Sequence, residues 1–122
     1  GTVVKVDRSV DLALILLPIP LEAIQTASER PRIDSEIVVV GYPYNIAQYA
    51  TVGHVQAFDG YSMFISAPIV PGNSGGGVFM QLPDGEWVLV GVVSQVLATM
   101  FSPIPHMGKV VDITTIRKFL NG

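Results

Sequence analysis

Apolar residues along the chain occur in short runs with the two-residue alternation of β-strands. β-Branched residues are frequent in these runs, and glycine, proline, asparagine or aspartate bounds them. The pattern predicts strands at residues 2–6, 12–17, 36–42, 48–58, 63–67, 77–81, 87–96 and 108–113. Leu-Pro-Asp-Gly at residues 82–85 predicts a hairpin, because an Asp-Gly pair tolerates the positive φ that such turns require.

The last segment has the period of a helix instead. Its apolar residues fall on one helical face: Ile113, Ile116, Phe119 and Leu120. Either Asp112 or Thr114 can cap its start, and Gly122 can end it. The pattern alone therefore predicts an all-β antiparallel barrel or sandwich with a short C-terminal helix.

Composition narrows the classes of partner. The 122 residues suit one domain, yet 49% are hydrophobic and only 14% charged, so we expect another part to cover some of the surface. The net charge of −3 without a basic cluster excludes nucleic acid as an expected partner. The apolar run from Leu12 to Pro20 is too short for a membrane span. Without cysteine there is no disulfide, thiol nucleophile or thiolate metal site.

The segment PGNSGGG, residues 71–77, is the first candidate for chemistry. A serine hydroxyl needs a base to become a nucleophile, and the oxyanion it forms needs preorganised donors. Glycines beside Ser74 permit unusual backbone conformations and leave room for a substrate carbonyl. The amides of Gly72 and Ser74 could then converge on one oxygen. A Gly/Ser connection between strands is the alternative interpretation.

Asp11 is the second candidate, because it directly precedes the apolar run 12–17. A carboxylate at the entrance of a strand can accept a hydrogen bond from an imidazole while the strand anchors it. By itself such an aspartate is more often a turn or capping residue. Together, DLALILL and PGNSGGG form a far more specific pair than either segment alone.

With these segments the chain resembles the trypsin-like serine proteases of the chymotrypsin fold, and in particular their HtrA/Deg branch. VVKVDRSVDLALILL resembles the segment around the catalytic aspartate of that family. VVVGYPYN (38–45) resembles its GNPFG turn, TVGHVQA (51–57) its TVGIVSA strand, and SAPIVPGNSGGGVF (66–79) its NPGNSGGPL loop. VGVVSQV (90–96) resembles its strand beside the substrate, and VVDITTIRKFL (110–120) its closing helix.

The resemblance implies a serine endopeptidase that acts on peptides or proteins without a cofactor or metal. Ser74 would be the nucleophile, and Asp11 would orient a histidine. The oxyanion hole would lie in Gly72-Asn73-Ser74, with the first and last amides as donors. Ser94 falls where the family has a serine beside the buried aspartate. A periplasmic or secreted location also follows from the resemblance alone.

The resemblance also implies where the substrate residue before the scissile bond would bind. The pocket would be lined near Pro68, by Ser94, Gln95 and Val96, and by Gly108. None of these residues is charged, so a bound Lys or Arg would be a buried, unpaired cation. Val96 stands where many relatives have glycine and should narrow the pocket. We therefore expect small or medium aliphatic side chains to be preferred.

The catalytic histidine of the family is missing. In the family it precedes the aspartate in a TAAHV-type motif, whereas here only ten residues precede Asp11. His54 and His106 follow Asp11 and are expected on a strand face and in a loop, without a recognised metal-ligand spacing. We therefore expect this sequence to be the C-terminal part of a two-barrel protease domain. The N-terminal part, which carries the histidine, would then be a separate chain or would have been removed.

In this interpretation residues 1–35 end the first barrel and connect the barrels, residues 36–110 form the second barrel, and residues 111–122 form the closing helix. An inactive protease-like binding or structural module remains the alternative, because the histidine is absent. Gly72-x-Ser74-x-Gly76 also matches the nucleophile elbow of α/β-hydrolases, with Asp84 and His106 following. That elbow needs a helix directly after the serine, where this sequence predicts a strand.

Overall fold

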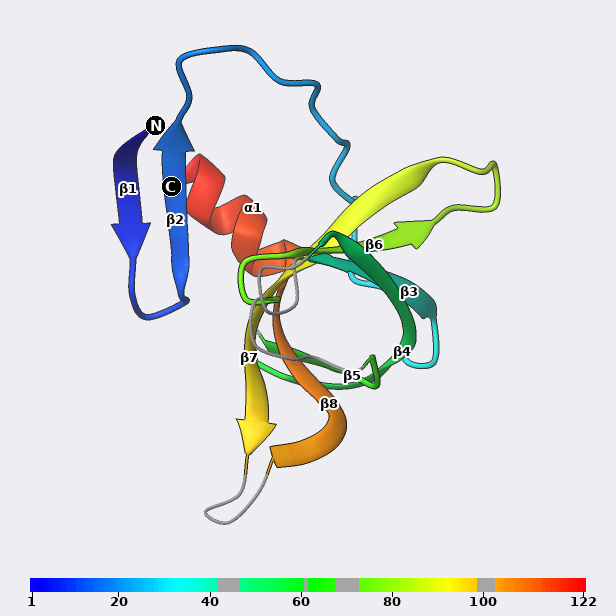
Figure 1. Ribbon diagram of the computed structural model, residues 1–122. Helices are drawn as coiled ribbons and strands as arrows, with labels where there is room; N and C mark the ends of the chain where they lie inside the picture. Colours follow the sequence, from blue (N-terminus) through cyan, green and yellow to red (C-terminus); the bar gives the residue numbers. More distant parts are fainter. Residues whose placement is uncertain (42–46, 61, 68–72, 99–102) are drawn as a thin grey trace.

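The computed structural model describes residues 1–41, 47–60, 62–67, 73–98 and 103–122. A closed six-stranded barrel, a separate two-stranded hairpin and one C-terminal helix make up the fold (Figure 1). The elements are β1 (Thr2–Asp7), β2 (Leu12–Leu16), β3 (Glu36–Gly41), β4 (Tyr49–Asp59), β5 (Ser62–Ile65), β6 (Gly77–Gln81), β7 (Trp87–Ala98), β8 (Pro103–Asp112) and α1 (Ile113–Asn121). The predicted antiparallel barrel with a short C-terminal helix is confirmed.

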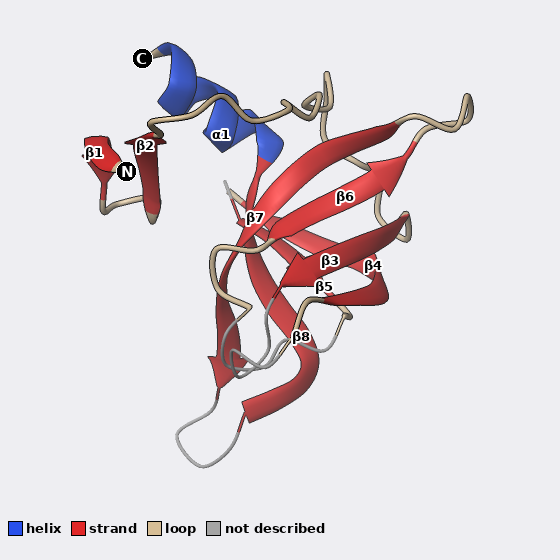
Figure 2. Ribbon diagram, turned by 45° about the horizontal axis from the view of Figure 1, so that its top comes forward, coloured by secondary structure: helices blue, strands red, loops and turns tan. Residues whose placement is uncertain are grey.

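The barrel closes in the order β3-β4-β5-β8-β7-β6, so that β6 returns to pair with β3 (Figure 2). Side chains alternate between its inside and outside as the sequence pattern predicts. On β3, Ile37 and Val39 are buried, whereas Val38 and Val40, which alternate with them, are only half-buried. The inward-facing residues of the other strands complete the core, among them Val55, Met63, Ile65, Val78, Val90 and Val110.

Two hairpins show how turns set the strand lengths. The predicted turn 82–85 joins β6 to β7, with Gly85 at φ 91°, a backbone conformation that glycine adopts without strain. The β7–β8 hairpin is longer than predicted, because pairing continues to Ala98 and Pro103. Strand β8 therefore begins five residues before the predicted start at Gly108. Proline at the first residue of a strand is compatible with pairing, since it needs no ladder donor there.

Asp112 joins the end of the barrel to the helix and to the connection between the hairpin and the barrel. Its buried carboxylate accepts a hydrogen bond from the Thr115 amide at 3.0 Å and so caps α1. It also receives Arg30, whose Nε and Nη2 lie 2.6 and 2.5 Å from Oδ2. Arg30 in turn donates to the Gly60 carbonyl and lies over the Phe58 ring. The sequence left Asp112 and Thr114 open as caps, and Asp112 is the cap.

The helix buries the apolar face that the sequence predicts, with one exception. Ile113, Ile116 and Phe119 are buried, but Leu120 is half exposed. Leu120 lies in the last turn, where the helix has run past the barrel toward β1–β2 (Figure 1). Nothing among the described residues covers that side. No helix in the described ranges is long and apolar enough to cross a membrane.

The β1–β2 hairpin stands beside α1 and away from the barrel (Figures 1 and 2). Lys5 anchors it to the helix, because its Nζ donates to the Phe119 carbonyl and lies over the Phe119 ring. Many large apolar side chains of the hairpin and of the following connection are exposed: Val3, Val4, Val6, Leu14, Ile15, Leu16, Leu17, Ile19, Leu21 and Ile24. So much apolar area on one side of a small body is typical of a surface that another part covers.

The turn of this hairpin is organised around Asp7. Its Oδ1 accepts hydrogen bonds from the Ser9 hydroxyl at 2.6 Å and from the Ser9 amide at 3.0 Å. The hydroxyl first, and the amide second, lower the pKa of Asp7 from its ordinary value of 3.8. Asp7 is therefore a local turn residue with a carboxylate held in its ionised form.

Asp112→Ala is expected to destabilise the complete protein by about 2–4 kcal/mol. Loss of the cap costs about 1 kcal/mol, and loss of a hydrogen bond to a charged group costs about 1.5–3 kcal/mol. Arg30 is 37% exposed, so water can solvate it after the substitution, which limits the cost. Chemical denaturation measures the change, with the exposed Asp59→Ala as control; equal effects of the two variants would contradict the prediction.

Ser9→Ala is expected to raise the pKa of Asp7 toward 3.8, as followed by NMR titration of the Asp7 carboxyl. A lowered pKa in the folded state stabilises the fold above pH 3.8, and that contribution is lost as the pH falls below it. The wild-type hairpin should therefore lose stability on acidification in this range, and the variant should lose less. An unchanged Asp7 pKa in the variant would show that the Ser9 hydroxyl does not lower the pKa of Asp7.

Candidate active site

Ser74 lies in a tight turn at the entrance of β6. The Gly76 amide donates to the Asn73 carbonyl at 2.9 Å and closes the turn. Two hydrogen bonds attach the turn to Val93 of β7: the Gly75 amide donates to the Val93 carbonyl at 2.8 Å, and the Val93 amide donates to the Gly76 carbonyl at 2.9 Å. Gly75 has φ 86°, a conformation that favours glycine. The glycines that the sequence singled out thus serve a fixed turn that exposes the Ser74 hydroxyl.

Ser94 connects the nucleophile candidate to the acid candidate. The Ser74 hydroxyl donates to the Ser94 main-chain carbonyl at 2.6 Å. The Ser94 hydroxyl donates to Asp11 Oδ2 at 2.7 Å. Three residues that the sequence proposed from separate segments therefore lie together, joined by the two polar groups of one serine.

A β-bulge explains why Ser94 can reach both neighbours. The pairing of β7 with β8 shifts register between Val93 and Gln95, so that Ser94 is the extra residue. Bulges occur next to active sites, where they re-aim a side chain or carbonyl out of the regular ladder. The regular two-residue pattern of this strand carries no signal for such an insertion.

Asp11 reaches Ser94 from the end of the turn between β1 and β2. Its backbone has φ 59°, a left-handed conformation that aspartate adopts more readily than most residues. Among the described residues, Asp7, four residues earlier, accepts its hydrogen bonds from Ser9 in its own turn. The two neighbouring acids therefore have different surroundings, and only Asp11 faces the serine pair.

The two histidines belong to barrel strands, His54 to β4 and His106 to β8. His54 is exposed on β4, opposite Glu36. Its main-chain amide donates to the Ser66 hydroxyl oxygen, and its main-chain carbonyl accepts from the Ser66 amide. No hydrogen bond joins it to Ser74 or Asp11 among the described residues. The main chain of His106 belongs to β8, where the sequence predicted a loop. Within the described ranges no group of His, Asp and Glu side chains is arranged to hold a metal ion.

The remaining candidates are located only in part. Gly72 and Pro68 lie outside the described residues. Asn73 is buried beside Ser74. Across β7 and β8, Val96 stands opposite Gly108, and Gln95 opposite Lys109, so two proposed pocket residues face each other across one ladder.

Gly41, which the sequence did not single out, also belongs to the surroundings of the turn. A side-chain carbon at this position would lie 2.6 Å from Asn73 Oδ1, so the Asn73 side chain occupies the space above it. Its only sequence signal is a glycine at the end of an apolar strand.

The strand β6 directly after the turn, and the absence of a helix there, exclude the α/β-hydrolase elbow.

Comparisons with known proteins identify the family. The family described as trypsin-like peptidase domain matches residues 1–92. An uncharacterized protein of Sinorhizobium fredii, y4bJ, is 33% identical over 106 residues, which cover 80% of this chain and 16% of that protein.

Solved protease structures match almost the whole chain. The active form of the Rv3671c protease from M. tuberculosis matches with a TM-score of 0.81 and 26% identity, over 98% of this chain and 56% of that chain. The serine endoprotease from Yersinia pestis matches with a TM-score of 0.78 and 25% identity, over 98% of this chain and 42% of that chain.

The chain thus spans less than two thirds of the length of these relatives. The family match, the barrel of the chymotrypsin-like fold and the Ser74–Ser94–Asp11 arrangement all lead to one assignment. The chain belongs to the trypsin-like peptidase domain family of serine proteases.

Proposed function

We propose that the complete protein is a serine endopeptidase that hydrolyses peptide bonds through an acyl-enzyme at Ser74. Asp11 orients a histidine that comes from a segment outside these residues, in the same or a separate polypeptide. The observation that carries the proposal is Ser94, which hydrogen-bonds Ser74 through its carbonyl and Asp11 through its hydroxyl. A turn that merely connected two strands would have no need for this pair of contacts.

The hydrogen bonds of the site support the proposal that a further residue acts as the base. The Ser74 hydroxyl donates to a neutral peptide carbonyl, which is too weakly basic to take its proton. Asp11 has a carboxylate but contacts the Ser94 hydroxyl and not Ser74. An imidazole between Asp11 and Ser74 would take the Ser74 proton, while Asp11 would hold its other nitrogen in the correct tautomer.

The reaction then follows the chemistry of acyl transfer. Ser74 Oγ bonds to the substrate carbonyl carbon as the imidazole removes its proton, and the carbonyl oxygen becomes an oxyanion. The amides of Gly72 and Ser74 are the proposed donors to that oxyanion. The imidazolium gives its proton to the leaving amine, and water then hydrolyses the acyl-enzyme with the imidazole as base.

The exposed apolar hairpin supports an N-terminal partner segment. Ile15 and Leu16 of β2 are 51% and 64% exposed, and Leu21 of the connection is 67% exposed. A first barrel that continues the β1–β2 sheet would cover these side chains and bring its histidine beside Asp11. This supports a division into residues 1–35 as the end of a first barrel with its connection, 36–110 as the second barrel, and 111–122 as the closing helix.

The second candidate function is that of an inactive protease-like binding or structural module. The observation in its favour is that, among the described residues, no imidazole contacts Ser74 or Asp11. The two functions differ in whether Ser74 becomes nucleophilic once the complete protein is assembled.

We also propose that the substrate residue before the scissile bond is small or medium aliphatic. Val96 lies directly opposite Gly108 on the strands proposed to line the pocket. A valine at this position, where many relatives have glycine, is expected to narrow the pocket. The proposed lining contains no carboxylate that could pair with a buried Lys or Arg of the substrate.

In the complete protein, a fluorophosphonate probe is expected to label Ser74, and Ser74→Ala should abolish the label. Asp11→Asn should slow labelling by about 10⁴-fold, because an amide holds the imidazole in the wrong tautomer. Asp7→Asn is the matched control, since Asp7 lies in the same hairpin but bonds only within its turn. It should label at the wild-type rate.

The same probe separates the two candidate functions. Residues 1–122 alone should label very slowly, because they lack the base, and addition of the histidine-bearing segment should restore the rate. An unlabelled Ser74 in the complete, folded protein would favour the inactive module.

Peptides that differ only at the residue before the scissile bond test the proposed pocket. The value of kcat/KM is expected to be higher for Val than for Phe, and lowest for Arg. A clear preference for Arg would contradict the assignment of Val96 and Gly108 to the pocket.

A further inference from the structure

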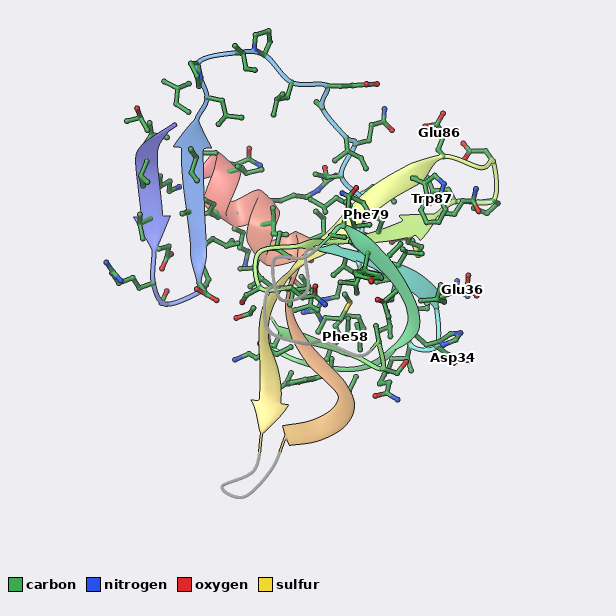
Figure 3. All side chains as sticks on the ribbon, viewed as in Figure 1. Asp34, Glu36, Phe58, Phe79, Glu86 and Trp87 are labelled. Atoms are coloured by element: carbon green, nitrogen blue, oxygen red, sulfur yellow. The ribbon has the colours of Figure 1, made fainter. Side chains whose placement is uncertain are left out.

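Lys5 reverses the usual distribution of charged and apolar residues on β1. The hairpin stands beside α1, and side chains project from both of its strands (Figure 3). The neighbours Val3, Val4 and Val6 are 58%, 53% and 52% exposed, whereas Lys5 is half-buried. Lysine is normally exposed and valine normally inside, so a lysine that faces the protein between exposed valines is unusual.

A β-bulge turns Lys5 toward the rest of the molecule. The register of β1 against β2 shifts between Val3 and Lys5, so that Val4 is the extra residue. Such a shift places the residues after it on the opposite face of the strand. Lys5 therefore shares the face of its partner Leu14. Leu12, two residues earlier on β2, lies on the same face and packs against the barrel core.

The ammonium group of Lys5 binds the C-terminal end of α1. It donates to the Phe119 carbonyl and lies 4.6 Å from the centroid of the Phe119 ring. Carbonyls in the last turn of a helix have no partner within the helix, and they form the negative end of its dipole. A cation is therefore the group suited to this place, and an apolar side chain would cover the ring but leave the carbonyl without this donor.

The hairpin that Lys5 attaches to the helix carries Asp11 in its turn. The Asp11 carboxylate accepts the Ser94 hydroxyl at 2.7 Å, and the next residue, Leu12, packs against the core. Apolar packing is not directional, so the Leu12 contact resists separation of the hairpin from the barrel more than it resists rotation. Lys5 adds a directional contact on the neighbouring strand, to a different element. Rotation of the hairpin would break this contact and displace the Asp11 carboxylate from Ser94.

We propose that Lys5 is a positioning residue of the active site, through which the C-terminal end of α1 sets the orientation of Asp11. The ammonium holds the hairpin, and the hairpin places the carboxylate. Lys5 needs no contact with Ser74 or with substrate for this effect. The proposal rests on the proposed peptidase function, because the orientation of Asp11 affects the reaction only if Asp11 orients a histidine.

In the complete protein, Lys5→Met is expected to lower kcat by about 10-fold, since a misplacement of about 1 Å can cost up to about 100-fold. The rate of fluorophosphonate labelling at Ser74 should fall in parallel. KM should change much less, because Asp11 is not part of the proposed substrate pocket. Lys5→Arg keeps a cation at this place and should restore most of the loss. A kcat of Lys5→Met equal to that of wild type would overturn the proposal.

Lys118→Met is the matched control. Lys118 lies in the last turn of α1 and lines the same pocket of about 440 Å³ as Lys5, but it is exposed and belongs to the helix itself. Its loss removes a charge from this end of the helix and leaves the contact with β1 in place, so kcat and KM should not change. A loss of kcat equal to that of Lys5→Met would overturn the proposal, because charge alone would then explain both effects.

A double-mutant cycle with Asp11 tests whether Lys5 acts through that residue. In the Asp11→Asn background the side chain no longer selects the imidazole tautomer, so Lys5→Met should lower kcat much less than in wild type. Equal fold-changes in the two backgrounds would assign the effect to general loosening of the fold and would overturn the proposal. Phe119→Leu removes the ring and keeps the carbonyl; it should give a smaller, equally Asp11-dependent loss, and it replaces Lys5→Met in the cycle if that variant does not fold.

NMR of the same variants separates the proposal from the peptidase function. Lys5→Met should shift the resonances of Asp11 and Ser94, and Lys118→Met should leave them in place. If fluorophosphonate leaves Ser74 unlabelled in the wild-type complete protein, the proposed function fails, but these shifts would still support Lys5 as the residue that holds Asp11 against Ser94. Unchanged Asp11 and Ser94 resonances in Lys5→Met would refute that role.

Discussion

The buried carboxylate of Asp112 is the contact on which the placement of the outlying elements depends. It caps α1 through the Thr115 amide and receives the guanidinium of Arg30 from the connection. The helix so fixed presents Phe119 to Lys5, and this contact holds the β1–β2 hairpin beside α1. A chain of polar contacts therefore runs from the end of β8 to the hairpin that carries Asp11. A buried carboxylate is acceptable here because both a cation and a helix amide satisfy it.

The site itself is built where two independently supported units meet. The barrel supplies Ser74 on a turn attached to β7, and it supplies Ser94 from a bulge of the same strand. The hairpin supplies Asp11, and the hydrogen bond from Ser94 is its direct polar contact with the barrel site. Ser74 and Asp11 therefore stand on different elements, the barrel and the hairpin. In the proposed function, a first barrel packed on the hairpin would both supply the base and fix the position of Asp11.

The exposed apolar area is concentrated on the hairpin that carries Asp11 and on the connection that follows it. Hairpin and connection residues such as Leu16, Ile19 and Leu21 are more than half exposed, whereas the barrel core residues are almost completely buried. The barrel thus satisfies its own hydrophobic requirements, and the hairpin does not. This chain matches 56% of the length of the Rv3671c protease and 42% of that of the Yersinia endoprotease.

Alternating apolar residues determined the barrel strands, because a strand with one face in a core needs the period of two that β3 shows. Local chemistry likewise determined the turn at Gly85, but it left Asp112 and Thr114 as alternative caps, and the structure decided for Asp112. The segments around Asp11 and Ser74 stood out because the proposed chemistry needs particular residues in order. Tertiary structure alone decided the rest. Leu120 is exposed because the helix outruns the barrel, and Ser94 meets both catalytic candidates because a bulge re-aims it. Asn73 lies against Gly41 because the Ser74 turn packs on the end of β3. These features depend on contacts between segments far apart in the chain, which the order of residues within a single segment does not encode.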